Sequence, residues 1–298
     1  MPRKKRVLIT GGSGFIGRNL TEALSPRYDI LAPKSAELDL LDAEAVEAFL
    51  RQNPVDAVVH GANMGGKRNA IVENLVEKNL RMFFNVARCS KHFGKMIQLG
   101  SGAEYDKQHT MPKMKEEYFG THVPADGYGF YKYVCAKYIE KTDAPITSLR
   151  LFGCYGKYED YEIRFISNAI CKSIFHLPIT IASQNVAFDY LHVDDLARLV
   201  EHFIGKDGRH RFYNATPDKS VDLLSIAKLV NEVSGHEMPI EVKNPGMGRE
   251  YSGNNTRLRE EIPGFEFTTL ESGVRQLYEW YLERREKIDI NKIRQDRY

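Results

Sequence analysis

The sequence has few of the features that mark metalloproteins, disulfide-rich proteins or membrane proteins. Its four cysteines stand singly along 298 residues, which argues against a paired Cys-x-x-Cys metal site and a dense disulfide framework. The nine histidines have no metal-ligand spacing, and no apolar run reaches the length of a membrane span. We therefore expect no metal site and no membrane partner.

Positive and negative side chains nearly balance in number. The formal net charge is +2, and basic residues gather only at positions 3–6. A solvated lead into the first strand is favoured there over a nuclear or nucleic-acid patch, so no nucleic-acid partner is expected. Only three apolar residues separate this cluster from the first glycines, which is too short for a secretory signal. We expect a cytoplasmic protein with reduced thiols.

Apolar strand candidates alternate with helical stretches over the first half of the chain. The strand candidates lie at 7–10, 30–32, 57–60, 96–99 and 146–151. Helical periodicity is clear over 69–92 and 128–140. This alternation predicts an α/β protein with a Rossmann-type, doubly wound parallel sheet covered on both faces.

Beyond residue 156 the pattern loosens and predicts a smaller, mixed α/β lid. A short strand is expected at 179–181, an aspartate-capped helix start at 193–196 and a helix over 223–233. Such a lid would cover the ends of the parallel strands, where open α/β sheets bind ligands. The predicted division is a cofactor-binding domain of 1–156 plus about 184–204, and a substrate-binding domain of 157–183 and 205–298.

The first strand candidate runs into a glycine-rich turn at 10–17, Thr-Gly-Gly-Ser-Gly-Phe-Ile-Gly, and a helical stretch follows. In this spacing Gly11 permits the sharp turn, Gly14 leaves room for a pyrophosphate, and Gly17 lets the helix pack against the strand. The phosphates would lie at the positive end of the helix. An ordinary glycine-rich turn is the alternative, but the flanking strand and helix favour dinucleotide binding.

Tyr128 and Lys132 are one helical turn apart, and Ser101 lies upstream of them. A free tyrosine has a pKa of about 10 and exchanges protons poorly at neutral pH. A lysine cation one turn away, together with an oxidised nicotinamide, favours the phenolate and makes the phenol a usable acid and base. A lone Tyr-x-x-x-Lys is a weak signal, but beside a dinucleotide turn it predicts hydride transfer.

Six motifs follow one another along the chain. They are the glycine turn, Asp39-Leu40, His60-Gly-Ala62, Gly100-Ser101 with Tyr105 four residues on, Tyr128-x-x-x-Lys132 and Leu191-His-Val-Asp-Asp195. In their order and spacing the sequence resembles the extended short-chain dehydrogenases/reductases that act on nucleotide-activated sugars, the NAD-dependent epimerase/dehydratase family. Segments 35–42 and 64–66 most resemble GDP-L-fucose synthase and related reductases of 4-keto sugars.

The resemblance implies a role for each matching position. Ser101 would hydrogen-bond the substrate carbonyl, Tyr128 would transfer the proton, and Lys132 would hold the nicotinamide ribose. Cofactor contacts are implied for Gly11, Ser13, Gly14, Phe15, Ile16, Gly17, Lys34, Asp39, Leu40, Gly61, Ala62, Asn79, Leu99, Lys132 and Phe152. Substrate contacts are implied for Met64, Gly65, Ala103, Arg164 and Arg249. A homodimer is also expected from the family.

Departures from the family pattern narrow the expected chemistry. Members that dehydrate a sugar carry an Asp-Glu pair just after the serine, where this chain has Gly102 and Ala103, so dehydration is not expected. Fucose synthases also epimerise, with a cysteine and a histidine at positions that are Ala103 and Arg164 here, and neither moves a proton at a sugar carbon. Phe188 replaces an arginine that grips the diphosphate, so Arg249 or Arg164 would supply that charge.

The sequence therefore predicts an NADPH-dependent reductase of a nucleotide-linked keto-sugar, with a GDP-sugar and its C4 ketone favoured. NADP is favoured over NAD because the second strand ends in Ala-Pro-Lys-Ser at 32–35, which is cationic rather than acidic. Two alternatives stay open: a 4-epimerase with tightly held NAD, and a non-catalytic nucleotide sensor on the same scaffold. An intact Ser101, Tyr128 and Lys132 set argues against the sensor.

Overall fold

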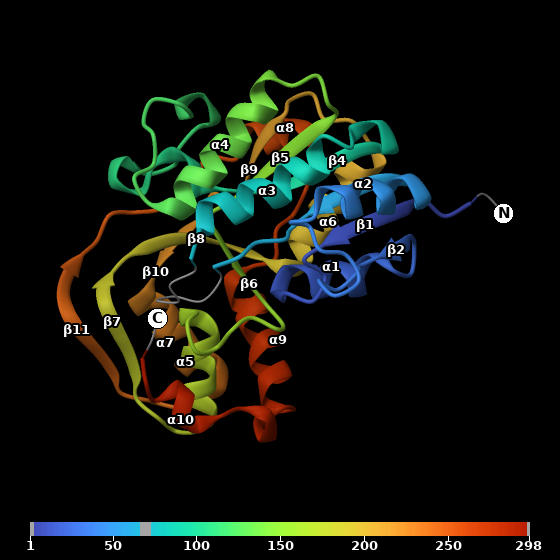
Figure 1. The fold of residues 1–298 in the computed structure, drawn as a ribbon. Helices are drawn as coiled ribbons and strands as arrows, with labels where there is room; N and C mark the ends of the chain where they lie inside the picture. The colour runs from blue at the N-terminus through green and yellow to red at the C-terminus, as the bar shows by residue number, and fades with distance from the viewer. Residues whose placement is uncertain (1–2, 66–72, 297–298) are drawn as a thin grey trace.

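The computed structural model describes residues 3–65 and 73–296, which form a larger and a smaller lobe (Figure 1). A six-stranded parallel sheet is the centre of the larger lobe. Its strands, in spatial order, are β2 (Asp29–Leu31), β1 (Arg6–Thr10), β3 (Val55–His60), β4 (Phe93–Ser101), β5 (Ile146–Leu151) and β9 (Phe212–Ala215). The chain order reverses between β1 and β3, which is where open α/β sheets bind ligands at the carboxyl ends of their strands.

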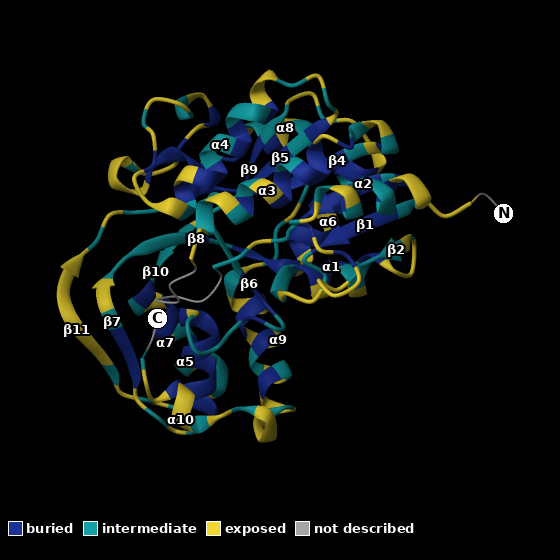
Figure 2. Ribbon diagram, in the orientation of Figure 1, coloured by how far each residue is buried: buried dark blue, intermediate teal, exposed yellow. Residues whose placement is uncertain are grey.

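Helices cover both faces of this sheet, which explains why its strands are apolar runs rather than alternating ones. One face packs against α1 (Phe15–Leu24) and α6 (Val193–Gly205). The other packs against α2 (Ala43–Gln52), α3 (Leu75–Ala87) and α4 (Gly127–Lys141). Figure 2 shows buried strands between these helices. The predicted Rossmann-type, doubly wound sheet is confirmed.

The smaller lobe is mixed α/β, as predicted. It has a three-stranded sheet of β10 (Ser220–Asp222), β8 (Ala187–His192) and β6 (Gly153–Tyr155), and a parallel pair, β11 (Ile240–Met247) and β7 (Ile179–Asn185). Its helices are α5 (Phe165–Ile174), α7 (Leu223–Ser234), α9 (Leu270–Leu282) and α10 (Ile290–Ile293). These helices share one apolar core with β7, while β11 forms the exposed outer edge (Figure 2).

The predicted division does not follow the sheets. β6 and β8 lie in ranges assigned to the cofactor-binding domain but belong to the smaller lobe's sheet, and the chain returns to the larger lobe after residue 205. β9 lies in the range assigned to the substrate-binding domain, yet it pairs with β5. Leu258 of α8 (Thr256–Glu261) packs in the core of the larger lobe. At the start of α6 the capping residue is His192, whose side chain accepts from the Asp194 amide, rather than an aspartate.

The helical stretch predicted over 69–92 is shorter in the structure. α3 ends at Ala87 and a 3-10 turn follows at Ser90–His92, while residues 69–72 lie outside the described part of the chain. The other 3-10 segments are η2 (Gly102–Tyr105), η3 (Lys107–His109), η4 (Glu116–Tyr118) and η5 (Arg285–Lys287). Within the described ranges, no helix combines the length and apolar character needed to cross a membrane.

Candidate active site

The glycine turn between β1 and α1 has the backbone that its spacing predicts. Gly11 has φ +74°, which favours glycine, and a Cβ there would lie 2.9 Å from the Ala62 backbone. A Cβ on Gly17 would lie 2.1 Å from the Gly11 carbonyl oxygen, so α1 can pack this close only with glycine. No described side chain caps α1 at Gly14, which leaves its first amides available to an anion. Together these features form a cradle that fits a dinucleotide pyrophosphate.

The remaining residues of the turn and the end of β2 border this cradle. Ser13 is exposed, and Phe15 and Ile16 begin α1 in half-buried positions. A Cβ on Gly12 would lie 2.8 Å from the Ala32 side chain, so the end of β2 adjoins the turn. The predicted adenosine-side residues that follow β2 differ in exposure, since Lys34 and Asp39 are exposed and Leu40 is buried.

The end of β3 is fixed by a buried hydrogen-bond chain. His60 Nδ1 and Thr10 Oγ1 are 2.9 Å apart, and the Thr10 hydroxyl accepts from the Ala62 amide at 3.3 Å. Burial lowers the pKa of His60 to about 3, so its imidazole is neutral at physiological pH. A Cβ on Gly61 would lie 3.1 Å from Leu99 Cδ1. Gly61 and Ala62 therefore lie beside the glycine turn, and Leu99 adjoins Gly61.

Asn79 holds the segment that follows β3. Its side chain accepts from the Met64 amide at 2.9 Å and donates to the carbonyls of Met64 and Leu75, at 3.1 and 2.8 Å. Both amide hydrogens of Asn79 are thus used within the protein. Gly65 follows with φ +99°, and residue 66, which completes the predicted Met-Gly-Gly motif, lies outside the described part of the chain.

Ser101 ends β4 and precedes the 3-10 helix η2. Its hydroxyl oxygen accepts from the Ala103 amide at 3.1 Å, and its own amide donates to Glu104 Oε1 at 2.9 Å. Since the oxygen accepts from the protein, the hydroxyl proton is left to donate. The Ala103 methyl group is fully buried, so it does not face the crevice between the lobes.

The start of α4 packs directly on this turn. A Cβ on Gly129 would lie 2.8 Å from the Ala103 carbonyl oxygen, so glycine permits the close approach that brings Tyr128 beside η2. Lys132 is buried one turn further on, and its Nζ donates to the Leu99 carbonyl at 2.6 Å. The structure gathers the three predicted catalytic residues at the carboxyl end of β4, namely Ser101, Tyr128 and Lys132.

A second tyrosine reaches the same place from the smaller lobe. A Cβ on Gly102 would lie 2.7 Å from the Tyr251 hydroxyl oxygen, so this hydroxyl lies beside the Ser101 turn, and burial raises the pKa of Tyr251 well above its usual value. Its ring packs against Phe152 and Phe188 at centroid distances of 5.1 and 5.9 Å. Sequence reasoning missed Tyr251, because a single tyrosine in an irregular segment has no spacing partner to mark it.

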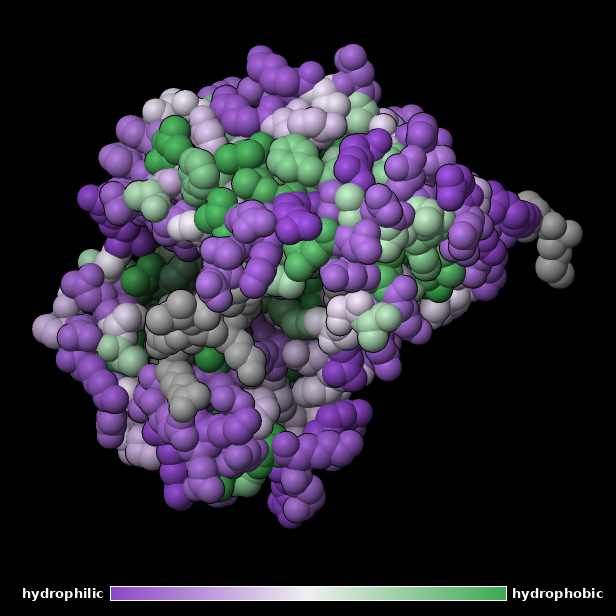
Figure 3. All heavy atoms as spheres, viewed as in Figure 1, coloured by the Kyte–Doolittle hydropathy of each residue, from purple (hydrophilic) through white to green (hydrophobic). Residues whose placement is uncertain are grey.

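The two arginines predicted to bind the diphosphate lie in different settings. Arg249 is exposed and donates to the Gln108 carbonyl, which joins the smaller lobe to the larger one. Arg164 is exposed at the N-terminal cap of α5. Burial raises the pKa of nearby Glu159 to about 7, and the charge of Arg164 opposes that shift. Figure 3 shows that the surface is hollowed between the two lobes.

Neither a reactive thiol nor a metal cluster accompanies these residues in the described part of the chain. Burial raises the pKa of the Cys154 thiol, which makes Cys154 a poor nucleophile. No group of three or more His, Cys, Asp or Glu side chains is placed to hold a metal ion among residues 3–65 and 73–296. The polar groups that the structure brings together at the end of β4 are the hydroxyl of Ser101, the ammonium of Lys132 and the phenol of Tyr251, with Tyr128 on the adjoining first turn of α4.

Two known proteins are similar to this chain in sequence. GDP-L-colitose synthase from Yersinia pseudotuberculosis is 23% identical over 303 residues, which cover 93% of this chain and 98% of that protein. GDP-L-fucose synthase from Azorhizobium caulinodans is 38% identical over 111 residues, which cover 35% of this chain and 36% of that protein.

A solved structure has the same fold over nearly the whole chain. It is the GDP-6-OMe-4-keto-L-xylo-heptose reductase from C. jejuni, with a TM-score of 0.82 at 19% identity, covering 95% of this chain and 99% of that one. The sequence model of the NAD dependent epimerase/dehydratase family matches residues 7–215, from β1 to the end of β9. The chain therefore belongs to the NAD-dependent epimerase/dehydratase family.

Proposed function

We propose that the protein uses NADPH to reduce the ketone of a nucleotide-linked keto-sugar, at C4 of a GDP-sugar, and that the product serves surface polysaccharide or deoxysugar synthesis. The observation that carries the proposal is the gathering of Ser101, Tyr128 and Lys132 beside the glycine cradle. The nucleotide-sugar class is supported by the names of the two relatives, and the 4-keto group by the name of the solved structure.

The cradle supports a nicotinamide dinucleotide, because a Cβ on Gly11 or Gly17 would collide with the backbone that shapes the turn, and Gly14 beside them has no side chain to fill the space for a pyrophosphate. When bound in its reduced form, this cofactor supplies the hydride. The preference for NADPH rests on Lys34, which is exposed just beyond β2. Glu37 is close by, but its carboxylate accepts from the Lys34 amide at 2.7 Å and so is engaged within the loop.

Ser101, Tyr128 and Lys132 have different roles in the proposed reduction. Ser101 donates its hydroxyl proton in a hydrogen bond to the ketone oxygen, which steadies the negative charge that develops there. Tyr128 gives its phenolic proton to the resulting alkoxide. Lys132 donates one Nζ hydrogen to the Leu99 carbonyl, and its other two hydrogens would be left to hold the nicotinamide ribose and to favour the phenolate of Tyr128.

Reduction without epimerisation is supported by the residues that surround these three. Neither the buried methyl of Ala103 nor the guanidinium of Arg164 removes a proton from a sugar carbon at neutral pH. Turnover in deuterated water should therefore leave C3 and C5 of the sugar unlabelled, as read by mass spectrometry and NMR. Deuterium at either carbon would show that the protein also epimerises.

The proposal is tested by adding NADPH and a panel of nucleotide 4-keto-sugars to the purified protein and following NADPH oxidation. We expect NADPH oxidation that depends on the added nucleotide sugar and is fastest with the GDP-linked 4-keto-sugar. Protein that carries tightly bound NAD and interconverts 4-epimers without consuming NADPH would instead be a 4-epimerase. Protein that binds the cofactor and turns over no sugar would be a sensor. We further propose a homodimer, which light scattering checks.

A further inference from the structure

The catalytic serine sits in a turn that one buried carboxylate holds closed. Glu104 Oε1 accepts the Ser101 amide at 2.9 Å, while Ser101 Oγ accepts the Ala103 amide at 3.1 Å, so the two ends of the turn bind each other. A Cβ on Gly100 would lie 2.7 Å from Glu104 Oε1, which shows how tightly the carboxylate lies against the strand. The direction of the Ser101 hydroxyl therefore depends on where Glu104 is held.

The second oxygen of Glu104 is held by an arginine on the next strand. Arg150 of β5 lies opposite Gly100 in the register of the sheet, and its Nε donates to Glu104 Oε2 at 2.6 Å. The two side chains are 1% and 2% exposed. A carboxylate this far from water needs a charged partner and hydrogen bonds of good geometry, and Glu104 has both.

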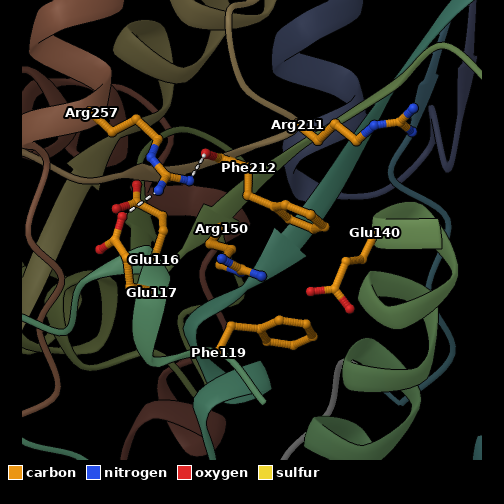
Figure 4. Close-up of a pocket in the computed structure, with 8 residues that line it drawn as sticks. All are labelled: Glu116, Glu117, Phe119, Glu140, Arg150, Arg211, Phe212 and Arg257. Carbon is orange, nitrogen blue, oxygen red and sulfur yellow. Dashed lines mark hydrogen bonds and ion pairs between the residues drawn. The ribbon is translucent and has the colours of Figure 1, made fainter. Parts of the chain in front are cut away.

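Arg150 is in turn held by further contacts through Nη1 and the flat face of its guanidinium, while its Nη2 has no hydrogen-bond partner in the described part of the chain. Its Nη1 donates to the Tyr105 hydroxyl at 3.1 Å, and that hydroxyl donates to Asn214 Oδ1 of β9 at 2.7 Å. Figure 4 shows the Arg150 side chain between the rings of Phe119 and Phe212. Its guanidinium lies 4.6 and 4.4 Å from the centroids of these two rings. These contacts hold the Arg150 guanidinium against β9 and against Phe119, which follows η4.

We propose that Glu104 and Arg150 are positioning residues, which set the Ser101 hydroxyl against the substrate's ketone oxygen without touching substrate or cofactor. This inference rests on the proposed reduction. A buried ion pair is often no more stabilising than apolar residues of similar volume, so stability alone does not account for this pair. The position of the pair behind the turn that carries Ser101 does account for it, because a shift of about 1 Å at a reacting group can lower the rate about 100-fold.

The test compares Arg150→Met with the double variant Glu104→Leu/Arg150→Met. The single variant leaves a buried carboxylate unpaired and should lose stability, whereas the double variant removes both charges and should recover most of it. A purely structural pair predicts that kcat recovers with stability. Positioning predicts that the double variant keeps a kcat about 100-fold below wild type, with the NADPH Kd within about twofold, and that Arg150→Lys retains an intermediate kcat.

Asp195→Asn is the matched control. Asp195 is 2% exposed, pairs with Arg198 and accepts the Thr268 amide at 2.8 Å, so it is a similar carboxylate away from the Ser101 turn. We expect Asp195→Asn to lose stability and keep its kcat. A double variant with wild-type kcat would overturn the inference.

A second readout does not depend on the reaction. Hydrogen exchange at the Ser101 amide should be about tenfold faster or more in the double variant, since its hydrogen bond to Glu104 is lost. Unchanged exchange would overturn the inference whatever the activity. If wild-type protein oxidises no NADPH with any keto-sugar, the proposed function fails, and the exchange result still decides whether Glu104 and Arg150 hold the turn.

Discussion

The two sides of the crevice are built in different ways. In the larger lobe, short motifs place the groups, because Gly11 and Gly17 shape one turn and Tyr128 and Lys132 share one helix. In the smaller lobe, Tyr251 comes from an irregular segment, and its amide donates to the Ala187 carbonyl of β8 at 2.9 Å. The groups of the larger lobe are thus encoded by local motifs in this chain, whereas Tyr251 of the smaller lobe is placed by tertiary contacts.

The lobes also differ in their buried titratable groups. In the larger lobe burial lowers the pKa of His60 from 6.5 to about 3, so the stability that neutral His60 contributes is present above pH 6.5 and is lost as pH falls towards 3. In the smaller lobe burial raises the pKa of Glu159 from 4.5 to about 7. Its contribution is present below pH 4.5 and is lost as pH rises towards 7.

The largest expected effect lies on the motif-built side. Tyr128→Phe removes one hydroxyl and keeps the ring, so the fold and the glycine cradle should survive while the alkoxide loses its proton donor. General acid catalysis is typically worth about 10²- to 10⁴-fold, or about 3 to 5 kcal/mol of barrier. We expect kcat to fall by that much with little change in the NADPH Kd. Tyr133→Phe on the same helix is the control, and equal losses in both variants would contradict the assignment.

The next effect concerns the smaller lobe. Glu159→Gln removes a buried carboxyl but keeps an oxygen that can accept from Ser167, as Glu159 Oε2 does at 2.6 Å. The pKa of Glu159 is higher in the folded than in the unfolded state, so wild-type protein loses stability as pH rises from 4.5 to 7. The variant should therefore become more stable relative to wild type over this range, by about 3 kcal/mol at most. Thermal unfolding at pH 4.5 and pH 8 measures this gain. A gain of equal size at both pH values would contradict the account.

A smaller effect tests how closely α1 must approach β1. Gly17→Ala places a methyl group 2.1 Å from the Gly11 carbonyl oxygen, and overpacking of this kind costs about 1 to 3 kcal/mol of unfolding free energy. NADPH binding should weaken as well, because the cradle shifts. Gly205→Ala is the control, since no described atom outside its own helix lies within 4 Å of the new methyl. Denaturant unfolding and NADPH titration compare the two variants.

The smallest effect concerns cofactor choice. Lys34→Asp puts an acid where the ribose 2′-hydroxyl of NADH would lie. We expect the ratio of kcat/KM for NADPH to that for NADH to fall about tenfold, which is about 1.4 kcal/mol. Lys228→Asp, an exposed lysine in the smaller lobe, should leave the ratio unchanged. Equal use of both cofactors by wild-type protein would argue against the NADPH preference.

Sequence reasoning reached most of the larger lobe because its signals are periodic or local. Five of the six large-sheet strands were predicted, and Gly11 and Gly17 are positions where a side chain would collide with the backbone. β9 was not predicted, because it pairs with β5 only after the chain has passed through the smaller lobe. That return of the chain is a tertiary event, which no local pattern marks.

The candidate site was predicted to the same extent and for the same reason. Ser101, Tyr128 and Lys132 lie on consecutive motifs and meet at the end of β4. Tyr251 and Arg150 did not stand out, because each lies against a residue more than forty positions away in the sequence, Gly102 for Tyr251 and Glu104 for Arg150. Arg150 in particular lies in a largely buried strand. Its charge is explained only by the buried carboxylate of Glu104, to which it donates.

The most direct test of the proposed reduction is the transfer of deuterium from NADPH labelled at the reactive carbon of its nicotinamide. Purified protein, labelled NADPH and a GDP-4-keto-sugar are incubated in ordinary water, and the product is analysed by mass spectrometry and NMR. The proposed reduction predicts one deuterium at C4 of the sugar and one equivalent of NADP released. A product without deuterium, formed while NADPH stays unconsumed, would contradict it.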